Sequence, residues 1–103
     1  MTRLQLLLNK LAEEGTEVAQ IALKTAQFGP DEVYPGQPLS NAERIHCELD
    51  HLHAQIEMLN EEYGFAYVPN RERIEAKKTA VNRFAAYSER LGMVTHAGNG
   101  DNR

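Results

Sequence analysis

The sequence predicts an all-α protein, an antiparallel helical bundle of three main helices completed by homo-oligomerisation. Apolar residues recur at steps of three and four in three separate segments, and the period-two alternation typical of strands is absent. Capping residues and stretches rich in glycine and proline separate the segments. With 103 residues, of which 42% are hydrophobic, the chain has enough apolar side chains for one small core. We expect a helical domain at 1–92 and a flexible C-terminal tail at 93–103.

The first helix is expected to run from a Thr2 cap to about Gln27, where Gly29 and Pro30 end it. One helical face carries its apolar stripe, which a single glutamate interrupts. The stripe consists of Leu4, Leu7, Leu11, Glu14, Val18 and Ile21. The following stretch, 28–39, contains three prolines and two glycines, so we expect an ordered but irregular connection.

The second and third helices have equally clear start signals. Ser40 followed by Glu43 is a capping box that predicts a helix over 41–62, and Asn70 caps a third helix that Gly92 ends. The stripe of the second helix is Ile45, Leu49, Leu52, Ile56 and Leu59. A further strip on this helix is Cys47, Ala54 and Met58. Burial on two sides in so short a chain indicates a partner subunit, so we expect a homodimer or homotetramer.

Composition excludes several classes of function. A formal net charge of −4 and a pI near 5.5 provide no basic surface for nucleic acid. No apolar run approaches the roughly 20 residues that span a bilayer, and the first residues do not form a signal peptide, so we expect a cytoplasmic protein without membrane contact. The single cysteine, Cys47, excludes an internal disulfide framework.

Acidic residues on the packing faces are the strongest functional signal. Glu14 lies within the first stripe, and Glu17 lies on the same side of that helix. Glu48 and position 51 repeat this arrangement on the second helix. A buried carboxylate is costly unless it is paired, hydrogen-bonded or bound to a cation. Two antiparallel helices packed along these stripes would bring the two pairs face to face, which predicts a site for Mg²⁺ or Mn²⁺.

The acidic spacing resembles that of a known family. The run Leu11-Ala12-Glu13-Glu14-Gly15-Thr16-Glu17, followed by Glu48, resembles the E-E-x-x-E … E-x-x-D signature of MazG-like all-α nucleoside triphosphate pyrophosphohydrolases. The runs at 76–82 and 88–92 also resemble the third helix of small, phage-type members. The resemblance implies a Mg²⁺ site at Glu14, Glu17, Glu48 and position 51.

Position 51 departs from that signature, because it is His51 rather than aspartate. Imidazole is a poor ligand for Mg²⁺ and suits Mn²⁺, Co²⁺ or Zn²⁺ better. The adjacent Asp50 is the alternative fourth ligand. On a regular helix it lies roughly 160° from Glu48 and would need a bulge to reach the site.

The resemblance also implies an activity, the metal-dependent hydrolysis of an NTP or dNTP to the monophosphate and pyrophosphate. Glu13 is a candidate for orienting or deprotonating the attacking water, and a solvent-facing role is its alternative. The phosphates would be contacted by Lys24, Lys77 and Lys78. The nucleobase would stack on an aromatic side chain, for which the candidates are Phe28, Tyr34 and Tyr67.

Three other interpretations stay open at this point. The chain would be a helical homo-oligomer that kept the bundle but lost the chemistry, acting as a nucleotide-binding or protein-interaction module. Alternatively, its substrate would be phosphoribosyl-ATP. A separate transition-metal patch on the second helix would consist of His46, Asp50, His53 and Glu57.

Overall fold

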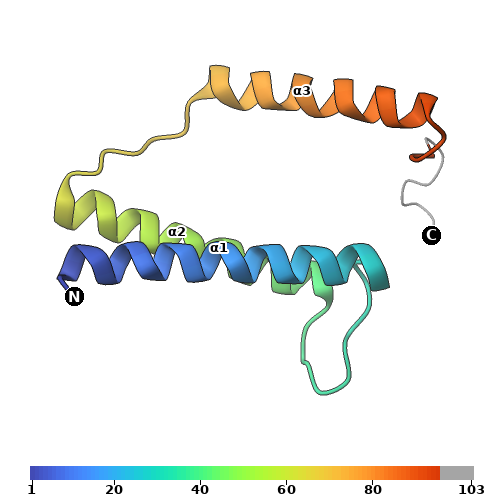
Figure 1. Ribbon diagram of the computed structural model, residues 1–103. Helices are drawn as coiled ribbons and strands as arrows, with labels where there is room; N and C mark the ends of the chain where they lie inside the picture. The colour runs from blue at the N-terminus through green and yellow to red at the C-terminus, as the bar shows by residue number, and fades with distance from the viewer. Residues whose placement is uncertain (96–103) are drawn as a thin grey trace. The chain divides into compact units, whose positions relative to one another are not determined.

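The computed structural model describes residues 1–95 and contains three helices within them. These are α1 (Arg3–Phe28), α2 (Asn41–Tyr63) and α3 (Arg71–Arg90), drawn in Figure 1. No strand occurs in the described residues, so the expected all-α class is confirmed there. The chain divides into two compact units, Met1–Tyr67 and Val68–Arg103. The three-helix bundle, the homo-oligomer and the domain boundaries stay predictions, and most of the expected tail, 96–103, lies outside the described residues.

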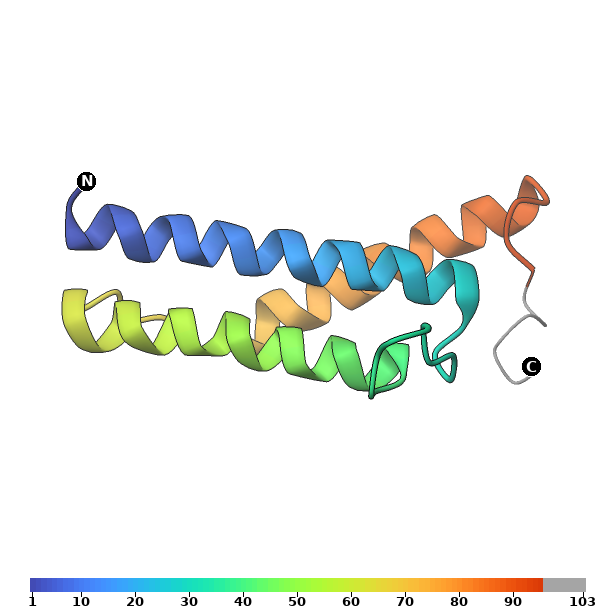
Figure 2. The same cartoon turned by 90° about the horizontal axis from the view of Figure 1, so that it is seen from below.

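Helices α1 and α2 form an antiparallel pair that holds the candidate site. They lie side by side in both views (Figures 1 and 2). Leu7, Ile21 and Leu59 are almost fully buried between them, with at most 3% of each residue exposed. At the end of the pair opposite the α1–α2 connection, the Arg3 guanidinium donates from Nε and Nη2 to the Glu62 carboxylate, both at 3.0 Å. This bidentate pair ties the start of α1 to the end of α2.

The core of this pair is narrower than the apolar stripes predicted. Leu4 and Leu49, both expected in the core, remain exposed. Cys47 and Ala54 are exposed as well. Two helices share one seam, so side chains at the margins of each stripe have no opposite surface to pack against within residues 1–67.

Both helices of the pair begin at a complete capping box. The Thr2 hydroxyl accepts from Gln5 N, and the Ser40 hydroxyl accepts from Glu43 N. The Glu43 carboxylate in turn accepts from Ser40 N at 2.9 Å, and these bonds to Ser40 hold the pKa of Glu43 below its usual value. The expected starts of both helices are confirmed.

The connection between α1 and α2 is irregular but firmly attached, as expected. Asn41, the first residue of α2, is only 1% exposed and is the centre of this attachment. Its side-chain amide donates to Gly29 O and to Glu32 Oε1, both at 2.9 Å. The backbone amides of Asn41 and Ala42 donate to Glu32 O and Pro30 O. The first amides of α2 are thereby satisfied by the loop that precedes them.

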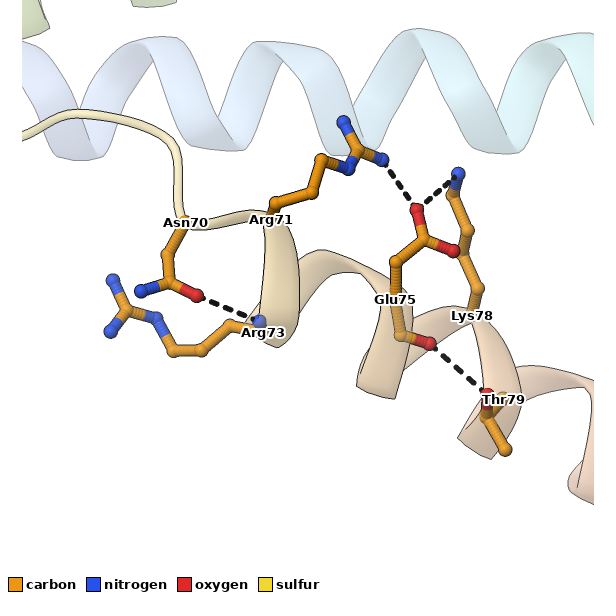
Figure 3. A network of polar contacts seen from close by, with 6 residues as sticks. All are labelled: Asn70, Arg71, Arg73, Glu75, Lys78 and Thr79. Carbon is orange, nitrogen blue, oxygen red and sulfur yellow. Dashed lines mark hydrogen bonds and ion pairs between the residues drawn. The ribbon is translucent and has the colours of Figure 1, made fainter.

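The second unit is described by itself. Asn70 caps α3 by accepting from Arg73 N at 2.9 Å, which confirms the expected start of this helix. Glu75 accepts from Arg71 Nη2 at 2.6 Å and from Lys78 Nζ at 3.2 Å (Figure 3). These two contacts lower the pKa of Glu75. No residue of α3 is buried.

Within residues 1–95, no helix combines the length and apolar character that a membrane span needs.

Candidate metal centre

Two glutamates of α1 and two residues of α2 meet at the middle of the helix pair. They are Glu14, Glu17, Glu48 and His51, and each offers one ligand atom within 4.8 Å of all the others. The two spacings of three residues place each pair on one side of its helix, and the antiparallel packing brings the two sides together. The four residues that the sequence selected are therefore neighbours in space. Asp50 is exposed and does not belong to the group, so the geometry favours His51 as the fourth ligand.

The side chains of the cluster differ in how far they are exposed to solvent. The side chain of Glu14 is 17% exposed, that of Glu48 is 26% exposed and that of His51 is 58% exposed. Glu14 Oε1 is buried and has no hydrogen-bond partner among residues 1–95. A buried carboxylate oxygen without a hydrogen bond is costly, so a cation bound beside this atom would stabilise it.

The imidazole of His51 faces the carboxylates through one nitrogen. Its Nδ1 lies 3.1 Å from Glu48 Oε1 and 3.8 Å from Glu14 Oε1. With a hydrogen on Nδ1 the ring donates to Glu48, whereas with the hydrogen on Nε2 the Nδ1 lone pair is free to bind a cation. The same atom can therefore serve as a hydrogen-bond donor or a metal ligand.

Three carboxylates at this distance repel one another. The pKa of Glu17 is raised, chiefly by the negative charge of Glu14, and further by partial loss of water and by Glu48. A divalent cation would relieve this repulsion and supply the buried Glu14 oxygen with a partner. Three carboxylates with one imidazole form a donor set that suits Mn²⁺, and the carboxylates alone suit Mg²⁺.

A cavity of about 300 Å³ opens beside the cluster along the seam between the helices. Glu17 and Glu48 line it and so belong to both the cluster and the cavity. Lys24 and Arg44 also line it, and neither forms an ion pair within residues 1–95. Two unpaired cations beside three carboxylates form a surface that can hold a metal and a polyanion together.

Lys24 was expected here from the sequence, but Arg44 was not. The sequence does contain an indication for Arg44, because this residue lies one turn before Glu48 and therefore on the same helical face.

A second cavity, of about 340 Å³, continues from the first towards the loop. The two share Lys24 and Arg44. The aromatic residues Phe28 and Tyr34 line the second cavity, as does the buried Asn41. The full lining consists of Lys24, Phe28, Glu32, Tyr34, Asn41 and Arg44. The sequence indicated the two aromatic residues but neither Glu32 nor Asn41.

Other residues selected from the sequence lie outside these cavities. Glu13 is 57% exposed and pairs with Lys10 at 3.1 Å, which matches the solvent-facing alternative. Tyr67 does not line either cavity; its backbone forms two hydrogen bonds with the side chain of Asn60. Lys77 and Lys78 lie on α3, in the second unit, and their role stays a prediction.

The proposed transition-metal patch does not form a ligand group. Within residues 1–95, Glu14, Glu17, Glu48 and His51 make up the one cluster of at least three such side chains with metal-binding spacing. His46, Asp50, His53 and Glu57 are all exposed residues of α2 outside it.

Comparison with known proteins adds no relative to this description. No family model matches the chain, and no curated protein or solved structure matches it significantly. The site's geometry and the sequence resemblance are therefore the grounds for a functional proposal.

Proposed function

We propose that this chain is a metal-dependent nucleoside triphosphate pyrophosphohydrolase, which cleaves an NTP or dNTP to the monophosphate and pyrophosphate. The observation that carries the proposal is a cluster of three carboxylates and an imidazole that opens onto a cavity with two unpaired cations. A carboxylate cluster alone would attract cations, and basic side chains alone would attract anions. Their combination suits a substrate that is itself a complex of a polyphosphate with a divalent cation.

The proposed metal ligands are Glu14, Glu17, Glu48 and His51. Two observations support cation binding, the unpartnered Glu14 oxygen and the raised pKa of Glu17. A divalent cation would give the Glu14 oxygen a partner and would relieve the repulsion that raises the pKa of Glu17. When bound, Mg²⁺ or Mn²⁺ supplies charge neutralisation at the phosphate oxygens and polarisation of a water molecule.

The substrate would extend along the two cavities. Lys24 and Arg44 would bind the triphosphate, since they line both cavities and have no competing ion pair. Phe28 and Tyr34 would contact the nucleobase at the loop end. Each cavity is at the lower end of the roughly 300–1,000 Å³ typical of ligand pockets, so an extended nucleotide would occupy both.

A carboxylate of the cluster is a better candidate than Glu13 for accepting the proton of the attacking water. Glu17 lines the cavity, so its carboxylate faces the space that the substrate and the attacking water would occupy. Glu13 instead pairs with Lys10 on the outer side of α1. In the proposed hydrolysis the water oxygen forms a bond to the α-phosphorus and the bond from the α-phosphorus to the oxygen that bridges it to the β-phosphorus breaks. Pyrophosphate leaves, and the proton released by the water passes to a carboxylate.

The test is pyrophosphate release from a panel of dNTPs, NTPs and phosphoribosyl-ATP, with Mg²⁺ and Mn²⁺ supplied separately. Glu14→Gln and Glu48→Gln are the site variants, and Glu13→Gln is the matched control because it changes the adjacent, exposed acid. We expect metal-dependent turnover that both site variants abolish and the control retains. Turnover on phosphoribosyl-ATP alone would reassign the substrate.

A folded protein without turnover on any substrate would refute the proposed enzymatic activity. It would favour the second candidate function, a nucleotide-binding helical module. The observation that favours this candidate is the exposed His51 at the position of an expected acid. Equilibrium binding of a non-hydrolysable α,β-methylene dNTP distinguishes it from a protein with no nucleotide site.

A further inference from the structure

The second cavity, beside the loop, has a polar wall whose side chains can accept hydrogen bonds from a ligand but not donate them. Asn41 belongs to this wall, and both hydrogens of its side-chain amide are already used. One is donated to Gly29 O and the other to Glu32 Oε1, each at 2.9 Å. The Asn41 side chain therefore has only its carbonyl oxygen left for a ligand, and that oxygen can accept but not donate.

The neighbouring Glu32 has the same character. An ionised carboxylate accepts hydrogen bonds and donates none. Asn41 holds one of its oxygens in place, and the backbone carbonyl of Glu32 accepts from Asn41 N at 2.9 Å. Because both its main chain and its side chain are tied to a residue that is 1% exposed, Glu32 is a positioned acceptor rather than a mobile surface acid.

The remaining lining residues supply stacking surface and anion binding. Phe28 and Tyr34 are each about half exposed, so their rings are available to a flat ligand. Lys24 and Arg44 are donors, but they lie where the two cavities meet and are assigned to the triphosphate. The Tyr34 hydroxyl can either donate or accept.

Resting on the proposed function, we propose that this cavity selects nucleobases that carry an exocyclic amino group, and that Glu32 is the residue that selects them. Cytosine, adenine and guanine present amino hydrogens that a carboxylate accepts. Uracil and thymine present a carbonyl in place of the cytosine amino group, and its oxygen would face the Glu32 carboxylate without a shared hydrogen.

The experiment compares kcat/KM for dCTP and dUTP, which differ at this position of the base, in the full chain and in Glu32→Gln. The glutamine keeps an oxygen for Asn41 but adds an amide that donates to a carbonyl. Asp31→Asn is the matched control, because Asp31 is an exposed acid in the same loop that does not line the cavity. We expect the native protein to favour dCTP by about ten-fold and Glu32→Gln to bring the ratio close to one.

Binding of α,β-methylene dCTP and dUTP, measured by calorimetry in the same variants, separates this inference from the proposed reaction. Selective binding that depends on Glu32 in a protein without turnover supports the base pocket and refutes the pyrophosphohydrolase. Turnover with equal use of dCTP and dUTP, or a preference for dCTP that Glu32→Gln leaves unchanged, refutes the base pocket and retains the enzyme. Absence of both binding and turnover overturns both.

Discussion

Replacing Glu14 by glutamine should change stability in opposite directions with and without metal. Glu14 is the most buried acid of the cluster, and its Oε1 has no hydrogen-bond partner among residues 1–95. An unsatisfied buried polar group costs about 1–3 kcal/mol. The neutral amide removes the repulsion with Glu17 and can donate to a neighbouring carboxylate. We therefore expect Glu14→Gln to stabilise the metal-free protein by about 1 kcal/mol, or roughly 4–8 °C in Tm.

Metal should reverse this order. A cation that binds only the folded state at 100 times its Kd stabilises the native protein by about 2.7 kcal/mol. The variant replaces one of the proposed carboxylate ligands by a neutral amide, so most of this gain should be lost. Thermal unfolding followed by circular dichroism, in EDTA and then in excess MnCl₂, measures both effects on the same samples.

Glu13→Gln is the control for this measurement, since it removes a charge at the adjacent position without touching the cluster. Its Tm should respond to MnCl₂ as the native protein does. A lower Tm of Glu14→Gln in EDTA would show that the carboxylate is satisfied in the folded state and would refute the argument from its unpartnered oxygen. A full response of that variant to MnCl₂ would refute its role as a ligand.

Three further predictions concern the same unit. Because neighbouring carboxylates raise the pKa of Glu17, the folded protein holds this proton more tightly than the unfolded chain does, and stability is lost as pH rises through the raised pKa. The advantage of Glu17→Gln over the native protein in EDTA should therefore grow from acidic to neutral pH in thermal unfolding, and a constant difference would contradict the assignment. His51→Asp should raise affinity for Mg²⁺ relative to Mn²⁺ in calorimetric titrations, and an unchanged ratio would exclude His51 as a ligand. Asn41→Ala should lower the free energy of unfolding in urea by about 1–3 kcal/mol, because it removes the buried hydrogen bonds to Gly29 and Glu32. A loss below about 0.5 kcal/mol, roughly the least that one hydrogen bond contributes, would show that the loop does not depend on this side chain.

The candidate site combines a predictable part with an unpredictable one. The spacing of Glu14 with Glu17 and of Glu48 with His51 indicated a four-residue cluster, because residues three apart share a helical side. The place of Glu14 in the apolar stripe indicated that its side chain would be buried, but not that Oε1 would have no hydrogen-bond partner. The exposure of that oxygen depends on how closely α1 and α2 approach each other at the position of Glu14.

The same distinction explains the residues that the sequence did not single out. Glu32 and Asn41 resemble ordinary surface polar residues in the sequence. They acquire a role only because the loop 29–40 is fastened to the first turn of α2, where it forms one wall of the second cavity. The contact joins residues nine to twelve positions apart, beyond the reach of helical periodicity.

The amino-acid sequence by itself determined the helical class of the described chain, the starts of the helices and the sides of α1 and α2 that carry the acids. These features depend on interactions between residues three or four apart, such as the hydrogen bonds of Thr2 with Gln5 and of Ser40 with Glu43. Only the tertiary structure decided which stripe residues are buried, which acid has an unpartnered oxygen and which cations line the cavities. Those properties arise where separate segments meet, and the free energy of each side chain there is set by neighbours that are distant along the chain.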